Sequence, residues 1–189
     1  MAPPGRRPQM EIHMRNLTDA DWAGLETWLS GAFIGTRKDG SPEALHSIRI
    51  GRALRDSGED DITVFGGYCH DVIEDIVGQD EGSVRQLALG MFGDPDAAVL
   101  AAALVVECSY NDEEYARSKA DRKTAACARW VSTDNLRVAA VKIEDVRDNA
   151  ATASGVPHPF ERDYLAWAAP LKSSLEDIVA ARGVRAVSP

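Results

Sequence analysis

The run Cys69-His70-Asp71-Val72-Ile73-Glu74-Asp75-Ile76 holds the residue types in this chain that are best suited to chemistry. A histidine and three carboxylates stand among apolar residues of the kind that proteins bury, and buried charges need compensation. A metal ion is the simplest source of that compensation. An imidazole with carboxylates is a mixed nitrogen and oxygen ligand set, which suits Mn, Fe, Zn or Mg better than a metal selected by thiolates. The run therefore predicts one part of a metal site.

Further ligands must come from elsewhere in the chain, because one histidine and its neighbouring carboxylate leave a coordination sphere incomplete. His46 lies 24 positions before His70 (70 − 46), on a separate predicted helix. Asp145 and Asn149 are four positions apart and share a helix face. Each has an ordinary alternative, since a lone histidine is more often a packing residue and Asp145 could pair with basic neighbours on the surface. The remaining two histidines, like the tryptophans, are interpreted as surface or packing residues: His13 and His158.

Helices must position these side chains. Apolar residues recur at helical spacing along most of the chain, and no strand-like alternation of useful length is present, which predicts an all-α class. The expected helices cover residues 18–33, 43–58, 61–77, 83–92, 97–106, 112–131, 133–153 and 160–178, the last with a bend at Pro170.

Two of these helices have recognisable starts. Thr18 with Asp21 resembles a capping box, and Asp94-Pro95 indicates an N-cap followed by proline at the first helical position. Residues 97–106 are apolar on nearly all sides, which predicts a helix at the centre of the core. The opening run lies on the helix expected at 61–77 and ended by Gly78. At about 100° per residue, its charged side chains would fall within an arc of roughly 140° and point toward one site.

Length and charge limit the classes of function. At 189 residues and 44% hydrophobic content, the chain predicts one globular domain at 18–182, with a flexible N-terminal tail at 1–17 and a C-terminal tail at 183–189. The net charge of −9 argues against a nucleic-acid-binding surface, although it permits a local pocket for a small anion. No run approaches the length of a membrane span, and no secretory segment is recognisable.

The cysteines indicate the compartment. Their number is odd and they form no Cys-x-x-Cys pair, which predicts reduced thiols and a cytoplasmic location: Cys69, Cys108 and Cys127. The oligomeric state is left open by the sequence.

The order His46, His70-Asp71, Asp145 resembles the H…HD…D pattern of the HD-domain metal-dependent phosphohydrolases. More narrowly, the chain is similar to the (p)ppGpp hydrolase domain of RelA/SpoT-type proteins and small alarmone hydrolases. Five segments carry this likeness: Arg-Lys-Asp-Gly-Ser-Pro at 37–42, His-Asp-Val-Ile-Glu-Asp at 70–75, Asp-Arg-Lys at 121–123, 142–149, and the closing helix at 160–168.

Some positions depart from the family pattern. Glu43 stands where the family has an aromatic residue, a His-x-x-Gln stretch is absent before Arg37, and Val-Arg-Asp at 146–148 replaces Arg-Leu-His. These changes surround the expected substrate pocket, so another nucleotide stays open as the substrate.

The resemblance implies an all-α HD-domain helical bundle with a metal site between core helices. The implied metal is Mn²⁺, with another divalent metal as the alternative, and the implied ligands are His46, His70, Asp71 and Asp145. The implied general acid/base pair is Glu74 and Asp75. The implied substrate-binding residues are Arg37, Lys38 and Asn149.

The implied activity is metal-dependent hydrolysis of the 3'-pyrophosphate of ppGpp or pppGpp, giving GDP or GTP and pyrophosphate. The expected partner is thus a small-molecule nucleotide, with neither nucleic acid nor membrane as a partner. Two alternatives stand beside it. One is an HD-domain phosphohydrolase or nucleotidase for another nucleotide, and the other is a catalytically silent nucleotide-binding domain.

Overall fold

A computed structural model describes residues 14–153 and 160–183 of the chain. Helices form nearly all of its regular structure, and the one β contact in these two ranges is an isolated bridge between Thr36 and Pro42. The all-α class predicted from the sequence is confirmed. In chain order the elements are α1 (Asp19–Ala32), α2 (Glu43–Asp56), α3 (Asp61–Cys69), α4 (Val72–Asp75), α5 (Glu81–Phe92), α6 (Pro95–Cys108), α7 (Asp112–Tyr115), α8 (Lys119–Val131), α9 (Leu136–Ala153) and α10 (Phe160–Gly183).

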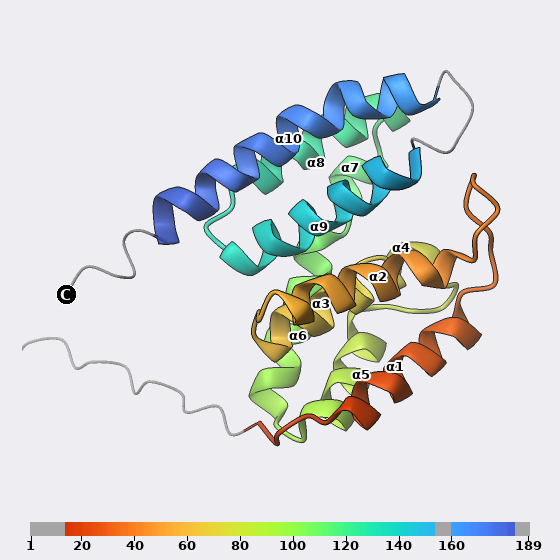
Figure 1. The fold of residues 1–189 in the computed structure, drawn as a ribbon, viewed down its shortest axis with the longest axis vertical. Helices are drawn as coiled ribbons and strands as arrows, with labels where there is room; N and C mark the ends of the chain where they lie inside the picture. The colour runs from red at the N-terminus through yellow and green to blue at the C-terminus, as the bar shows by residue number, and fades with distance from the viewer. Residues whose placement is uncertain (1–13, 154–159, 184–189) are drawn as a thin grey trace, which may run out of the picture.

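The helices form two groups that meet at α9 (Figure 1). One group contains α1 to α6 and the other contains α8 to α10, and α9 packs against α2 and α3 of the first group as well as against α10. Helix α3 lies at the centre, in contact with α2, α6 and α9. Every residue of α3 after Asp61 is buried, whereas α6, which the sequence places at the centre of the core, buries seven of its 14 residues and exposes Val99 and Val106.

The two helix starts recognised from capping residues are confirmed. Thr18 and Asp21 form a reciprocal capping box at α1, and Asp94 accepts hydrogen bonds from the backbone of α6 with Pro95 at the first helical turn. Gly58, directly after the C-cap of α2, has the left-handed backbone angle expected of a helix stop, at φ 83°. Gly78 is also left-handed, at φ 84°, but the helix before it has already ended at Asp75, with Ile76 as its C-cap.

The single helix predicted over 61–77 is wrong. Helix α3 ends at Cys69, the chain turns at His70 and Asp71, and the short helix α4 follows. The local reason is the His70 ring, whose Nδ1 lies 3.0 Å from the carbonyl oxygen of Gly67. That carbonyl is the acceptor that the amide of residue 71 would use in a continuous helix. The arc calculated for a straight helix therefore does not explain how these side chains converge.

The helix predicted over 112–131 is also wrong, because it is divided into α7 and α8. Ser118 has an extended backbone and its hydroxyl accepts a hydrogen bond from the Asp121 amide, so a new N-cap restarts the helix. Two other boundaries shift for the same kind of reason. Asp80 is the N-cap of α5, so this helix begins at Glu81 and not at Ser83 as expected. At the start of α9, the Asn135 side chain accepts a hydrogen bond from the Arg137 amide.

Helix α10 contains Pro170 and is one element, so the bend expected there does not divide it. Among the described residues, no helix is long and apolar enough to cross a membrane. His13, His158 and the loop expected at 155–159 lie outside the described residues. The predicted domain limits stay predictions, although the backbone of Arg15, within the predicted tail, donates a hydrogen bond to Phe92.

Candidate metal centre

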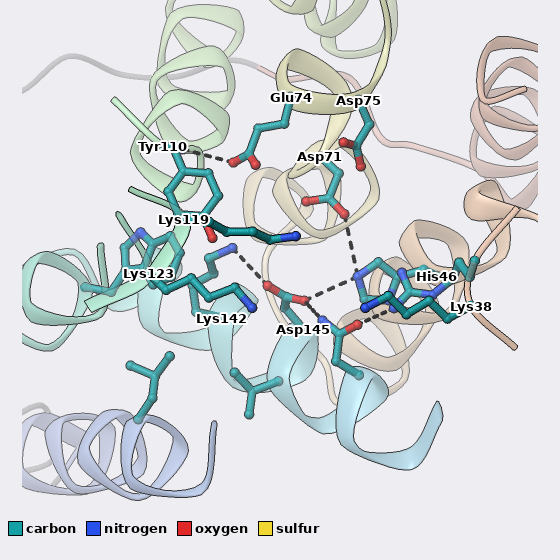
Figure 2. A pocket seen from close by; sticks show the side chains of 15 residues that line it. Lys38, His46, Asp71, Glu74, Asp75, Tyr110, Lys119, Lys123, Lys142 and Asp145 are labelled. Atoms are coloured by element: carbon teal, nitrogen blue, oxygen red, sulfur yellow. Dashed lines mark hydrogen bonds and ion pairs between the residues drawn. The ribbon is translucent and has the colours of Figure 1, made fainter. Parts of the chain in front are cut away.

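A pocket of about 380 Å³ opens where α2, α4, α8 and α9 approach one another. Figure 2 shows the side chains that line it, with three carboxylates along one edge, Asp145 across from them, and lysine amines pointing into the space between from both sides. The acidic members are Asp71, Glu74, Asp75 and Asp145. The basic members are Arg37, Lys38, Lys119, Lys123 and Lys142. The cavity thus combines a metal-binding type of ligand set with a basic wall.

The predicted metal ligands lie together. His46 Nε2 is 3.3 Å from Asp145 Oδ1 and 3.6 Å from Asp71 Oδ2, while His70 Nε2 is 3.0 Å from Asp71 Oδ2 and 3.9 Å from Asp145 Oδ1. Two atoms bound to one divalent ion at about 2.0–2.2 Å lie about 3–3.5 Å apart. The observed separations therefore suit a shared ion. One ligand atom from each of His46, His70 and Asp145 lies within 4.8 Å of the other two. Asp71 is not one of these three residues, but its Oδ2 lies close to the Nε2 atoms of both rings.

The His70 ring supplies an independent test of whether a cation fits. Its Nδ1 is occupied by the Gly67 carbonyl, so the proton of a neutral ring lies on Nδ1 and Nε2 carries a lone pair. This Nε2 is buried and has no hydrogen-bond partner among the described residues, because Asp71 Oδ2 approaches it without hydrogen-bond geometry. Buried polar atoms are seldom left unpaired. A divalent cation would accept the lone pair of this nitrogen, so the residues at this site fit a bound metal ion.

The His46 ring has the same arrangement with a different acceptor. Its Nδ1 lies 2.7 Å from Asp148 Oδ2, and Arg49 donates two hydrogen bonds to the same carboxylate. Asp148 was not among the site residues predicted from the sequence. Its sequence signals were an i+3 spacing from Asp145 along α9, which a surface carboxylate can also have, and its place in the 146–148 segment that departs from the family pattern.

The carboxylates between the rings are held ionised. Although burial opposes it, the charge of His70 lowers the pKa of Asp71 to about 2, and the charge of Lys142 places the pKa of Asp145 well below its usual range. Lys142 Nζ lies 2.9 Å from Asp145 Oδ2, and Asn149 donates to Oδ1. The pairing of Asp145 with a basic neighbour therefore exists, and it leaves Oδ1 facing both rings.

Glu74 and Asp75 line the pocket beside Asp71 (Figure 2). Burial and then the negative charge of Asp71 raise the pKa of Glu74 to about 7 and that of Asp75 to about 6. The Tyr110 amide donates a 2.9 Å hydrogen bond to Glu74 Oε1, which fixes this side chain. Carboxyl groups that change protonation near neutral pH are suited to proton transfer.

The three predicted substrate-binding residues also line the pocket. Two of them bond each other, because the Arg37 guanidinium donates to Asn149 Oδ1. Lys38 stands at the basic wall together with Lys119 and Lys123. Burial lowers the pKa of the Lys38 and Lys123 amines, and the positive charge of Lys119 lowers both pKa values further. Sequence reasoning missed Lys119. Lys123 was noted there within the Asp-Arg-Lys motif but without a role.

Comparison with known proteins bears on the fold. No protein-family model and no curated protein matches this sequence. Among solved structures, the chain is similar to a metazoan orthologue of SpoT described as hydrolysing ppGpp and playing a role in starvation responses, with a TM-score of 0.66 and 19% sequence identity. The match covers 89% of this chain and 99% of that chain. This likeness shows that the chain shares the overall fold of that structure, in agreement with the helical bundle that the motifs imply.

Proposed function

We propose that this chain, which has the fold of a SpoT-type ppGpp hydrolase, is a metal-dependent phosphohydrolase that removes the 3'-pyrophosphate of ppGpp or pppGpp. The observation that carries the proposal is the convergence of two imidazole Nε2 atoms and two carboxylates in a pocket with a basic wall. The products would be GDP or GTP and pyrophosphate. Mn²⁺ is the proposed ion, held by His46, His70, Asp71 and Asp145.

Each part of the pocket answers one requirement of the reaction. A phosphate ester carries negative charge, which repels a nucleophile and grows in the transition state. When bound, the divalent ion supplies a Lewis acid at the phosphorus centre and acidifies a water molecule. Glu74, with its pKa near 7, accepts a proton from the attacking water, and Asp75 beside it completes the acid/base pair.

The basic wall supports a phosphate-rich substrate. The protein has a net charge of −9, yet three amines face one cavity: Lys38, Lys119 and Lys123. Burial and then the positive charge of Lys119 lower the pKa of Lys38 and of Lys123. A local positive potential of this kind attracts anions of several charges. Arg37 and Asn149, joined by their hydrogen bond, line the pocket as the proposed nucleoside contacts.

A second candidate is hydrolysis of a different nucleotide. Glu43 occupies the position where the related hydrolase motif has an aromatic residue. Burial and the charge of Asp71 are the two larger causes that raise the pKa of Asp75, and the negative charge of Glu43 raises it further. An added negative charge near the acid/base pair favours a substrate with a different distribution of phosphates.

The test is a comparison of substrates and variants. Purified protein with Mn²⁺ is offered ppGpp, GTP, deoxynucleotides and nucleoside monophosphates, and pyrophosphate and phosphate are measured. We expect pyrophosphate release from ppGpp, a loss of about 10²–10⁴-fold in kcat for Glu74→Gln, and loss of turnover for His46→Ala. Glu176→Gln on α10 is the matched control, since this half-exposed carboxylate lies away from the pocket.

The outcomes separate the candidates. Preferential turnover of another nucleotide would support the second candidate and refute the first. Binding of ppGpp without metal and without turnover would indicate a silent binding domain. Full activity of Glu74→Gln would remove Glu74 from the mechanism.

A further inference from the structure

Asp148 has a defined place beside the metal site and no role in the motif pattern. It stands on α9 where the related hydrolase motif has histidine, within the 146–148 segment that departs from that pattern. Its side chain is 14% exposed, and it faces the ring edge of His46 that points away from the other ligands.

Both Asp148 oxygens are engaged. Oδ2 accepts from His46 Nδ1 at 2.7 Å and from Arg49 Nη2 at 2.9 Å, while Oδ1 accepts from Arg49 Nε at 2.5 Å. Arg49 lies three residues after His46, on the same face of α2. A two-point arginine contact fixes the plane of a carboxylate as well as its position. The carboxylate is thereby held in one orientation against the ring.

This contact decides which nitrogen of His46 can bind a cation. An ionised carboxylate accepts hydrogen bonds and cannot donate them, so Nδ1 must carry the proton and Nε2 is the nitrogen left to bind. His70 reaches the same state through the Gly67 carbonyl. The two rings therefore present the same nitrogen through two unlike acceptors, one from the backbone of α3 and one from a side chain of α9.

We propose that Asp148, oriented by Arg49, is a positioning residue that keeps the proton of His46 on Nδ1 and aims Nε2 at a divalent cation. The inference rests on the metal site of the proposed function but not on its substrate. Carboxylates in this position beside a ligating histidine raise metal affinity, and their loss costs about 10–100-fold.

If the contact between Asp148 and Arg49 had a purely structural role, a different experimental result would be expected. The same contacts connect α2 to α9, and a salt bridge with that function alone would change the stability of the fold without changing metal affinity. Arg52 provides the matched comparison. It stands one turn further along α2 and makes an equivalent two-point contact with Glu26, away from the histidines.

The experiment measures the dissociation constant for Mn²⁺ by electron paramagnetic resonance, and the melting temperature of the metal-free protein. We expect Asp148→Ala and Asp148→Asn to weaken Mn²⁺ binding about 10–100-fold, because neither enforces the proton on Nδ1. Arg49→Gln should weaken binding by roughly two- to tenfold, since Asp148 is then present but less constrained. Arg52→Gln should leave Mn²⁺ affinity unchanged.

A spectroscopic signature gives a second readout in folded protein saturated with Zn²⁺. In ¹⁵N-labelled wild type, both ligand rings should show protected Nδ1–H signals. In Asp148→Ala the His46 signal should be lost to exchange with solvent while the His70 signal persists as an internal control. Unchanged Mn²⁺ affinity in both Asp148 variants, or a persistent His46 signal, would overturn the proposal. Wild type that binds Mn²⁺ but turns over no ppGpp refutes the proposed substrate alone, whereas wild type that binds no Mn²⁺ refutes both proposals.

Discussion

At the scale of single residues, protons and the proposed metal ion would compete for the same atoms. Burial lowers the pKa of His46, but hydrogen bonds to Asp145 and Asp148 outweigh it and raise that pKa to about 9 in the metal-free protein. A proton on Nε2 therefore occupies the place of the cation near neutral pH. The aspartates around it are already ionised and release no proton in this range.

Metal affinity should consequently depend on pH with a defined sign. Below pH 9 the ion must displace one proton from His46, so we expect the Mn²⁺ association constant to rise about tenfold per pH unit between pH 6 and 8. Titration calorimetry in buffers of different ionisation enthalpy checks the release of one proton. Glu74→Gln, which removes a neighbouring group with a pKa near 7, should keep the slope. An affinity independent of pH would contradict this assignment.

The same raised pKa makes a statement about folding. Because His46 binds its proton more tightly in the folded chain than at the ordinary value of 6.5, protonation stabilises the fold below that pH. This contribution is lost as pH rises from 6.5 through about 9. Protonation of His46 and the proposed metal binding would thus stabilise the folded state in opposite pH ranges.

Residue types were predictable from the sequence where the motif is contiguous. The His-Asp-x-x-Glu-Asp run predicted a cation site and an acid/base pair, and the structure brings all of its charged members to one pocket or its edge, while their roles stay predictions. Asp148 and Lys119 were not predicted as site residues. Their roles depend on which side of α9 and α8 faces the cavity, and charged residues at those spacings are equally common on solvent-facing surfaces.

At the scale of elements, one close contact between α2 and α3 determines how near the two histidines lie. Gly51 and Gly67 allow these helices to approach, and the ring centroids of His46 and His70 are 5.1 Å apart. A Cβ atom at Gly51 would enter the ring of Tyr68. That ring cannot easily move, because it stacks on Trp22 and its hydroxyl donates to Glu26.

Gly51→Ala should therefore destabilise the fold by about 1–3 kcal/mol and weaken Mn²⁺ binding, because the helices that carry the histidines are forced apart. Chemical denaturation and metal titration measure the two effects. Gly24→Ala in α1 is the matched control, since a Cβ there meets nothing within 4 Å. That control should stabilise the protein by about 0.5–1 kcal/mol through helix propensity. Equal effects of the two substitutions would show that crowding against Tyr68 is unimportant.

Helix existence was predictable from periodicity, whereas two helix breaks were not. Periodicity extends across His70 and across Ser118 because the residues on both sides of each break are compatible with a helix. The breaks arise from side-chain contacts to backbone groups, the His70 ring on the Gly67 carbonyl and the Ser118 hydroxyl on the Asp121 amide. Such competition is decided by rotamer and tertiary contact, which a single sequence does not display.

At the scale of the whole molecule, the candidate site joins parts of the chain that are distant in sequence. Its members come from α2, from the turn after α3 and from α9, the helix at which the two groups of Figure 1 meet. A cation at this point would hold the two groups together. Binding to the folded state alone also shifts the folding equilibrium by mass action.

Mn²⁺ should accordingly raise the melting temperature. At 100 times its dissociation constant a ligand adds about 2.7 kcal/mol, which corresponds to roughly 5–10 °C for a chain of this size. Differential scanning calorimetry with Mn²⁺ and with a chelator measures the shift. Asp145→Asn should abolish it, and Asp177→Asn on α10 should retain it. Absence of a shift in the wild-type protein would contradict metal binding to the folded state.

The distribution of the site along the chain also bears on its biosynthesis. His46, His70 and Asp71 leave the ribosome well before Asp145, which follows Asp71 by 74 positions (145 − 71). Until α9 has been made, the nascent chain holds two imidazoles and one carboxylate without the helix that completes the set. Stable capture of the proposed cation would thus belong to the last part of translation, and a chain truncated before α9 would leave the histidines unable to retain a metal.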